Sequence, residues 1–156
     1  MEIEYSQPVL YKHFGSMEEI VEAVALEGFG ELAETLRTAR RSAGSARDAL
    51  TRTARAFSKF AIDNPALYDA MFSRATRLRF ASADTPAALH AAFGELRAAV
   101  AAVDHERDSE TLTEVFWAGL HGLATLGRGD RLRPGHEDER LELLVAQLAV
   151  TGSSKL

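Results

Sequence analysis

Alanine and leucine greatly outnumber the β-branched residues in this sequence, and this imbalance restricts the folds open to the chain. The 156 residues include 27 Ala and 19 Leu but only 8 Val and 3 Ile. Small and straight-chain side chains lose little rotamer freedom in a helix, whereas β-branched side chains favour strands. We therefore expect an all-α fold.

Apolar residues recur at spacings of three and four along most of the chain, as expected for amphipathic helices. A capping box formed by Ser16 and Glu19 predicts the start of the first long helix. Asn64 is expected to cap a short helix in which Pro65 occupies the first turn. The expected helices are 16–39, 45 up to Asn64, 65 to about 74, 86–103, 109 to about 126, and a last helix containing 141–148.

Composition and charge exclude several classes of protein. With 46% hydrophobic and 26% charged residues, the chain has an ordinary globular composition and a length suited to one domain. Its formal charge of −5 gives no global attraction for nucleic acid, so any DNA contact must be local. No secretion signal or apolar run of about 18 residues is present, which predicts a soluble, cytoplasmic protein.

Motifs for catalysis, metals and cofactors are absent or weak. The chain has no cysteine, and its five histidines lack the spacing of a metal site. Residues 28–33, GFGELA, match a dinucleotide-binding pattern, but they lie inside a helical period, which favours close helix packing or a bend. We expect no enzyme activity, no metal and no cofactor.

Arginines gather where the first long helix meets the second. They are interspersed with acidic residues, which is typical of a solvated surface, although a role facing phosphate stays open. The six residues are Arg37, Arg40, Arg41, Arg47, Arg52 and Arg55.

Two C-terminal helices carry apolar residues over an unusually wide arc. A monomer would leave part of this surface exposed, and large exposed apolar patches mark interfaces. A four-helix contact with a second copy would cover it, so we expect a homodimer. The expected interface consists of Phe116, Leu120, Leu123, Leu141, Leu144, Val145 and Leu148.

The segment 6–16, SQPVLYKHFGS, has the composition of a helix that enters a DNA groove. Ser6 can cap it, and its apolar residues share one face. The opposite face collects groups that read bases or contact phosphate. The expected DNA-binding residues are Gln7, Pro8, Tyr11, Lys12 and His13.

Residues 6–24, SQPVLYKHFGSMEEIVEAV, resemble the recognition helix, turn and fourth-helix start of the tetracycline-repressor (TetR) family. Residues 116–123, FWAGLHGL, resemble the Trp, His, Gly signature of one C-terminal domain class in that family, and the helix order between the two segments agrees. The resemblance implies a TetR-like helical bundle with a partial helix-turn-helix, because the two helices that precede the recognition helix would need about 30 further residues. Met17 also stands where the family tends to carry Lys.

The resemblance further implies a homodimer whose C-terminal helices enclose a small-molecule pocket. Residues 1–24 would be the partial DNA-binding region, and residues 25–156 the ligand-binding and dimerisation domain. Aromatic and Met side chains with a few polar tips suit such a pocket, although each could equally be plain core. The candidate ligand-binding residues are Phe57, Phe60, Tyr68, Met71, Phe72, Phe93, Trp117 and His121.

The leading hypothesis is a TetR-like transcriptional regulator, most simply a repressor, that releases operator DNA when a small apolar effector binds. The alternative is a ligand-binding and dimerisation module that no longer binds DNA. A short recognition helix without its supporting helices cannot hold its side chains in a groove. We therefore expect the chain as given to bind DNA weakly and without sequence preference.

Overall fold

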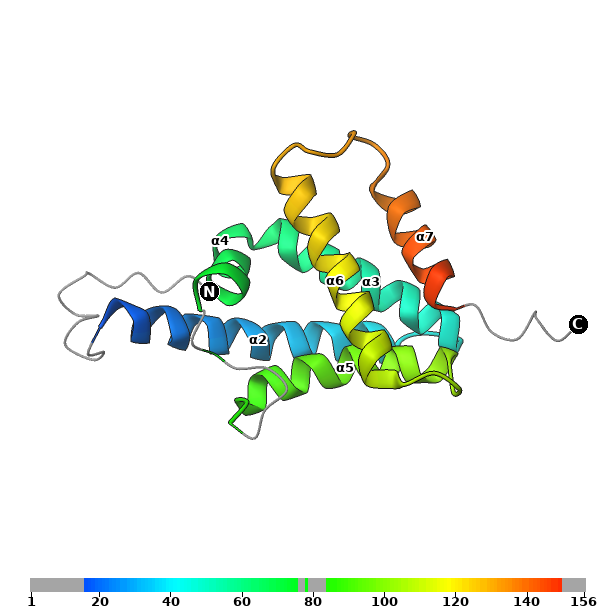
Figure 1. The fold of residues 1–156 in the computed structure, drawn as a ribbon, viewed down its shortest axis with the longest axis horizontal. Helices are drawn as coiled ribbons and strands as arrows, with labels where there is room; N and C mark the ends of the chain where they lie inside the picture. The colour runs from blue at the N-terminus through cyan, green and yellow to red at the C-terminus, as the bar shows by residue number, and fades with distance from the viewer. Residues whose placement is uncertain (1–15, 76–77, 79–83, 150–156) are drawn as a thin grey trace, which may run out of the picture.

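The computed structural model describes residues 16–75, 78 and 84–149 and contains no β-strand within them. This part of the chain forms six α-helices and one π-helix, which confirms the all-α prediction, and Figure 1 shows how the helices are arranged. The helices are α2 (Met17–Arg41), α3 (Ala46–Asp63), α4 (Pro65–Asp69), η1 (Ala70–Arg74), α5 (Ala87–Val103), α6 (Ser109–Arg128) and α7 (Glu137–Leu148). None of these helices is long and apolar enough to cross a membrane.

The polar residues at the helix starts act largely as the sequence predicts. Ser16 Oγ accepts a hydrogen bond from Glu19 N at 3.2 Å, and Ser45 Oγ accepts one from Asp48 N at 3.1 Å. Asp108 caps α6 by accepting from Thr111 N at 2.9 Å. Each bond satisfies an amide that has no partner within its own helix.

The junction after α3 differs from the prediction in two respects. Asn64 does not cap the following helix with its side chain; its Nδ2 instead donates to Phe60 O at 3.0 Å and so closes α3. Pro65 does occupy the first turn of α4. The expected single helix over 65–74 is divided, because residues 70–74 widen into the π-helix η1.

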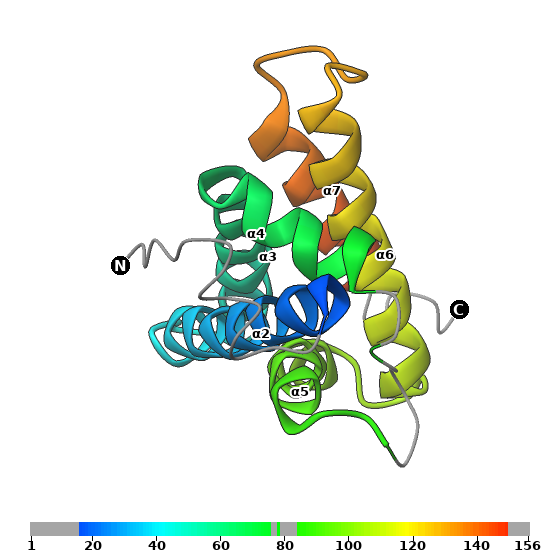
Figure 2. The same ribbon diagram turned by 90° about the vertical axis from the view of Figure 1, so that its left-hand side faces the viewer.

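The core lies where α2, α3 and α5 pack against one another and α6 crosses them. Figures 1 and 2 show α2 and α5 side by side along the long axis, with α6 and α7 grouped on one side of the molecule. Large fully buried side chains come from α2, α3, α5 and α6, among them Phe29, Phe57, Val100 and Phe116. The core is therefore continuous across the helices rather than divided into separate clusters.

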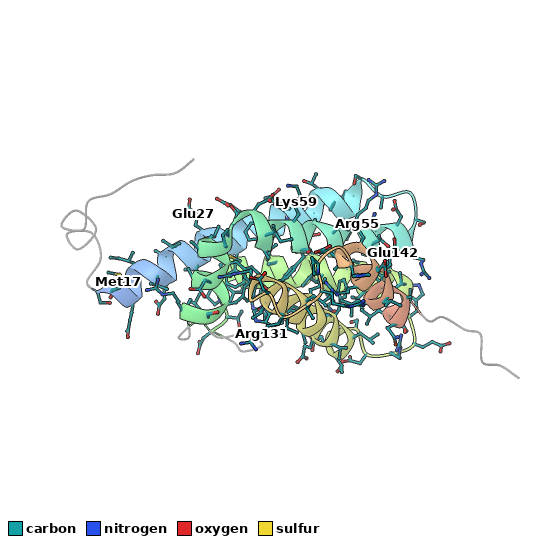
Figure 3. The ribbon with its side chains drawn as sticks, turned by 90° about the horizontal axis from the view of Figure 1, so that it is seen from above. Met17, Glu27, Arg55, Lys59, Arg131 and Glu142 are labelled. Atoms are coloured by element: carbon teal, nitrogen blue, oxygen red, sulfur yellow. The ribbon has the colours of Figure 1, made fainter. Side chains whose placement is uncertain are left out.

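A buried carboxylate joins α2 to α5. Glu95 is 8% exposed, and its two oxygens accept from Arg37 Nε at 3.1 Å and Arg40 Nε at 2.9 Å. Two other arginines of the group predicted as a solvated surface also have partners: Arg52 pairs with Asp48 at 2.8 Å, and Arg55 lies 3.5 Å from Glu142 on α7 (Figure 3). The arginines thus form interhelical as well as surface ion pairs.

A second polar connection fixes the turn between α5 and α6. Asp104 accepts from the amides of Glu106 and Arg107, each at 2.9 Å, and from Arg107 Nε. These hydrogen bonds, the Arg107 amide first, lower the pKa of Asp104 to about 2. Arg107 Nη2 also donates to Leu148 O at 3.0 Å, so the same turn holds the end of α7.

The two glycines of the GFGELA segment have different surroundings. A Cβ built on Gly28 would lie 2.6 Å from Met71 Sδ and 2.8 Å from Leu67 Cδ1, whereas one built on Gly30 would meet nothing within 4 Å. The predicted close helix packing is therefore correct for Gly28, where α2 contacts α4 and η1. At Gly30 the structure leaves open space.

Gly28→Ala is expected to lower the free energy of unfolding by about 1 kcal/mol, because overpacking outweighs the gain in helix propensity. Gly30→Ala is the matched control, and it should raise that free energy by about 0.5–1 kcal/mol. Urea denaturation of both variants and the parent measures the difference. Equal effects of the two substitutions would show that the contact with Met71 does not change the free energy of unfolding.

The residues predicted as a dimer interface lie largely in the core of one chain. The structure buries Phe116, Leu120, Leu141, Val145 and Leu148 in the core of a single chain, and only Leu123 and Leu144 stay half-buried. The apolar stripe of each helix faces the other helices of its own chain. Any surface available to a second copy on α6 and α7 must therefore be the adjoining arc.

Candidate functional site

Aromatic side chains from five helical elements meet in one cluster at the centre of the molecule. Phe72 on η1 lies in the middle, and its ring centroid is 4.5–6.3 Å from those of the other rings. The cluster, called the aromatic cluster below, consists of Phe29, Phe57, Tyr68, Phe72, Trp117 and His121. Ring pairs at these distances prefer the tilted and edge-on arrangements seen here.

Helical spacing explains why these residues meet. Tyr68 and Phe72 are four residues apart, as are Trp117 and His121, so each pair shares one side of its helical segment. The first pair faces the second: Tyr68 stacks on His121 with centroids 5.6 Å apart, and Phe72 lies 5.8 Å from Trp117. Two short sequence motifs therefore build opposite walls of one site.

A hydrogen bond of 2.6 Å joins Tyr68 Oη to His121 Nδ1. Burial raises the pKa of the Tyr68 hydroxyl above its ordinary range, although the charge of Arg128 opposes the shift, so the hydroxyl stays neutral and donates. Burial also lowers the pKa of His121, which favours the neutral ring. With Nδ1 accepting, Nε2 carries the ring proton and is a donor.

Acidification is expected to destabilise the protein through His121. The unfolded imidazole has a pKa of about 6.5, and burial places the folded value below it. Between the folded and unfolded pKa values the unfolded state binds more protons than the folded state. The contribution of His121 to the free energy of unfolding is therefore fully present above about pH 6.5 and is lost as the pH falls through this window. Thermal melting of the parent and His121→Asn from pH 8 to 5 measures this. If the melting temperature of His121→Asn depends on pH as strongly as that of the parent, His121 is not the group responsible.

A small cavity adjoins the aromatic cluster. Its volume is about 10 Å³, which is room for about one water molecule, and its walls are apolar. It is lined by Phe29, Leu32, Phe57, Phe72, Leu89, Ala92, Phe93, Leu96 and Trp117. The site as it stands is packed, and a ligand must displace side chains to enter it.

An open cleft lies on the other side of Phe93 and Trp117, between α5 and α6. Its volume is about 140 Å³, and Leu89, Phe93 and Trp117 line both this cleft and the small cavity. Its remaining wall is polar and consists of Thr85, His90, Glu110 and Glu114. The two spaces together offer an apolar interior with a polar entrance, which suits a small organic ligand.

A larger hollow of about 400 Å³ lies between α3, the end of α6 and the start of α7. It contains Leu123 and Leu141, which the sequence analysis assigned to the dimer interface. Charged side chains of both signs surround it, namely Arg128, Arg133, Arg140, Asp130 and Glu137. This mixture favours no single class of ligand.

The structure brings together most of the residues predicted to bind a ligand. Phe57, Tyr68, Phe72, Trp117 and His121 form the aromatic cluster, and Phe93 lines both the cavity and the cleft. Phe60 and Met71 are buried but line neither space. His121 also lines neither space, so its place in the site rests on the bond to Tyr68.

Sequence reasoning missed Phe29 and Leu32 on α2, which line the small cavity. Their apolar spacing marks a buried face but gives no sign that this face borders a cavity. The predicted DNA-binding residues Gln7, Pro8, Tyr11, Lys12 and His13 lie outside the described residues. Within the described residues, no cluster of His, Asp and Glu could hold a metal ion.

Comparison with known proteins agrees with this geometry. Residues 50–148 match a family model described as "Tetracyclin repressor-like, C-terminal domain". A solved structure of a protein with unknown function from Rhodococcus sp. RHA1 is similar with a TM-score of 0.74 and 27% sequence identity over 88% of this chain and 75% of that chain. No curated protein gives a significant match. The matched region contains the aromatic cluster except Phe29.

Proposed function

The chain belongs to the tetracycline repressor-like C-terminal domain family, and on this premise we propose that it is a ligand-responsive transcriptional regulator that represses its target. Residues 25–156 bind the effector and dimerise, and residues 1–24 contribute to DNA binding. The effector is a small, largely apolar molecule, the DNA is an operator, and the protein acts in the cytoplasm. It is a regulator of the Trp-His-Gly class rather than an enzyme.

The main support for this proposal is the path of helix α2 through the molecule. Phe29 and Leu32 of this helix line the small cavity, and Arg37 and Arg40 attach the helix to α5. Its N-terminal end, marked by Met17, extends beyond the other helices (Figures 1 and 3). One continuous helix of 25 residues thus leads from the ligand site to the segment predicted to read DNA.

Effector binding would act on DNA through this helix. A ligand that enters beside Phe93 and Trp117 must widen the space between α2, α5 and α6, because the cavity holds only about 10 Å³. Movement of α2 then changes the separation of the two reading segments in a dimer. The effector shifts this equilibrium only to the extent that it binds one arrangement more tightly than the other.

Mobility-shift titrations test the DNA-binding part of the proposal. They compare this chain with one extended by any residues that are encoded in frame upstream. Each protein is titrated against DNA from the region before the gene and against random DNA of equal length. Selective binding that is lost in Lys12→Ala and retained in Lys59→Ala is expected from the longer chain. If neither chain discriminates between the two DNAs, the assignment as a DNA-binding regulator is wrong.

Dimerisation is supported by the apolar arc that α6 and α7 leave uncovered. Val115 is 55% exposed and Leu143 is 64% exposed, and Ala118 and Leu126 continue the arc along α6. Their spacing places Val115, Ala118 and Gly122 on one side of α6. Side chains of this size exposed on two adjacent helices are typical of a helical interface.

Light scattering at micromolar concentration is expected to give about twice the chain mass of 17.0 kDa. The double substitution Val115→Glu and Leu143→Glu should reduce this to the mass of one chain while the circular dichroism spectrum stays helical, since both side chains are exposed in the single chain. Val24→Glu on α2 is the control and should leave the dimer intact. A monomeric parent protein would contradict the dimer.

A ligand-binding and dimerisation module without DNA binding is the second candidate. It is favoured by one observation: the family match begins at residue 50 and covers none of the predicted DNA-reading segment. The two candidates differ only in the mobility-shift result. Both require the effector site described above.

A further inference from the structure

The open cleft between α5 and α6 combines an aromatic wall with acidic side chains. Trp117 and Phe93 form its inner wall with Leu89, and Glu110 and Glu114 stand at its entrance. Glu110, Glu114 and Trp117 follow one another at spacings of four and three, so α6 presents all three on the same side. The cleft therefore sets negative charge next to an indole ring.

The two glutamates are not equivalent. Glu110 Oε1 accepts from Arg97 Nη1 at 3.3 Å, and Arg97 Nε also donates to Ser109 Oγ at 3.0 Å, which keeps this cation beside Glu110. In the part of the chain that the structure describes, no basic side chain forms an ion pair with Glu114. The cleft thus keeps one carboxylate that a bound cation could pair with.

We propose that this cleft selects an organic cation as the effector: an ammonium group carried on an aromatic or branched apolar body. The charged group lies between Glu114 and the face of Trp117, where carboxylate and indole ring both attract a cation. The apolar body packs on Leu89 and Phe93, which line both the cleft and the small cavity. This inference rests on the proposed function, whose effector site it specifies.

Three small probes of matched size test the charge preference. They are phenyltrimethylammonium, its neutral analogue tert-butylbenzene, and the anion benzenesulfonate. Trp117 is the one tryptophan of the sequence, so its fluorescence on excitation near 295 nm reports occupancy of the cleft without any label. The cation is expected to bind about tenfold more tightly than the neutral analogue, and the anion more weakly than both.

Glu114→Gln keeps the shape of the side chain and removes its charge. It should weaken binding of phenyltrimethylammonium by at least about threefold and leave tert-butylbenzene unchanged, because only the cation interacts with the charge. Glu106→Gln, which removes an exposed charge in the turn between α5 and α6, is the matched control and should change neither affinity. Melting temperatures of both variants verify that the fold is intact.

The outcomes separate this inference from the proposed function. Equal affinity for the cation and the neutral analogue, or equal effects of Glu114→Gln and Glu106→Gln, would overturn the charge preference and leave the effector site standing. Binding of no probe to the cleft would overturn the inference. The proposed regulator would then be judged by the mobility-shift and light-scattering results alone.

Discussion

Phe57→Ala is expected to lower the free energy of unfolding by about 3–5 kcal/mol, the range found when large aromatic side chains are removed from cores. Phe57 is 1% exposed, and its ring lies 6.0 Å from Tyr68 and 6.3 Å from Phe72. The substitution would remove contacts in the aromatic cluster and enlarge the existing cavity. Chemical denaturation of the parent, Phe57→Ala and the exposed control Val24→Ala measures the effect, and the control should change stability by less than about 0.5 kcal/mol.

The same variant tests whether the small cavity can become a ligand site. Removing the ring next to a cavity of about 10 Å³ leaves an apolar space, and such spaces stay dry and bind benzene. Benzene should therefore raise the melting temperature of Phe57→Ala more than that of the parent, by mass action on the folded state. A loss of stability below about 1 kcal/mol, with no response to benzene, would mean that the core around Phe57 collapses to fill the space.

Leu120→Glu is expected to abolish folding rather than dissociate a dimer. Leu120 is 2% exposed within one chain, and a carboxylate there would be buried without a partner, at a cost of more than about 4 kcal/mol. Circular dichroism should show loss of helix and of the cooperative melting transition. A folded Leu120→Glu protein of single-chain mass would instead restore Leu120 to the interface and contradict the burial described here.

The helices were predictable because their signals are local. Ser16, Ser45 and Pro65 begin helices where the sequence places them, since a cap or a first-turn proline acts within three or four residues. Two predictions in this group were wrong. The Asn64 side chain bonds back to Phe60 O instead of capping α4, and residues 70–74 form a π-helix.

The candidate site was predictable in part. Tyr68, Phe72, Trp117 and His121 were selected for their residue types, and the structure places them within one cluster. Sequence alone could not separate Phe93, which borders a cavity, from Phe60, which does not, because both show the same helical spacing. It also gave no means to choose Phe29 and Leu32 among the many apolar residues of the first helix.

The sequence by itself determined the helical class of the fold, the helix starts, and the two motifs that carry the family resemblance, because each depends on residues close together in the chain. Only the tertiary structure decided which apolar arc of α6 and α7 is core and which is exposed, and how Glu95, Arg37 and Arg40 pair across helices. It also decided that Glu114 and Trp117 border an open cleft. The physical reason is that burial and electrostatic pairing depend on the relative rotation of helices distant in sequence, which helical periodicity does not specify.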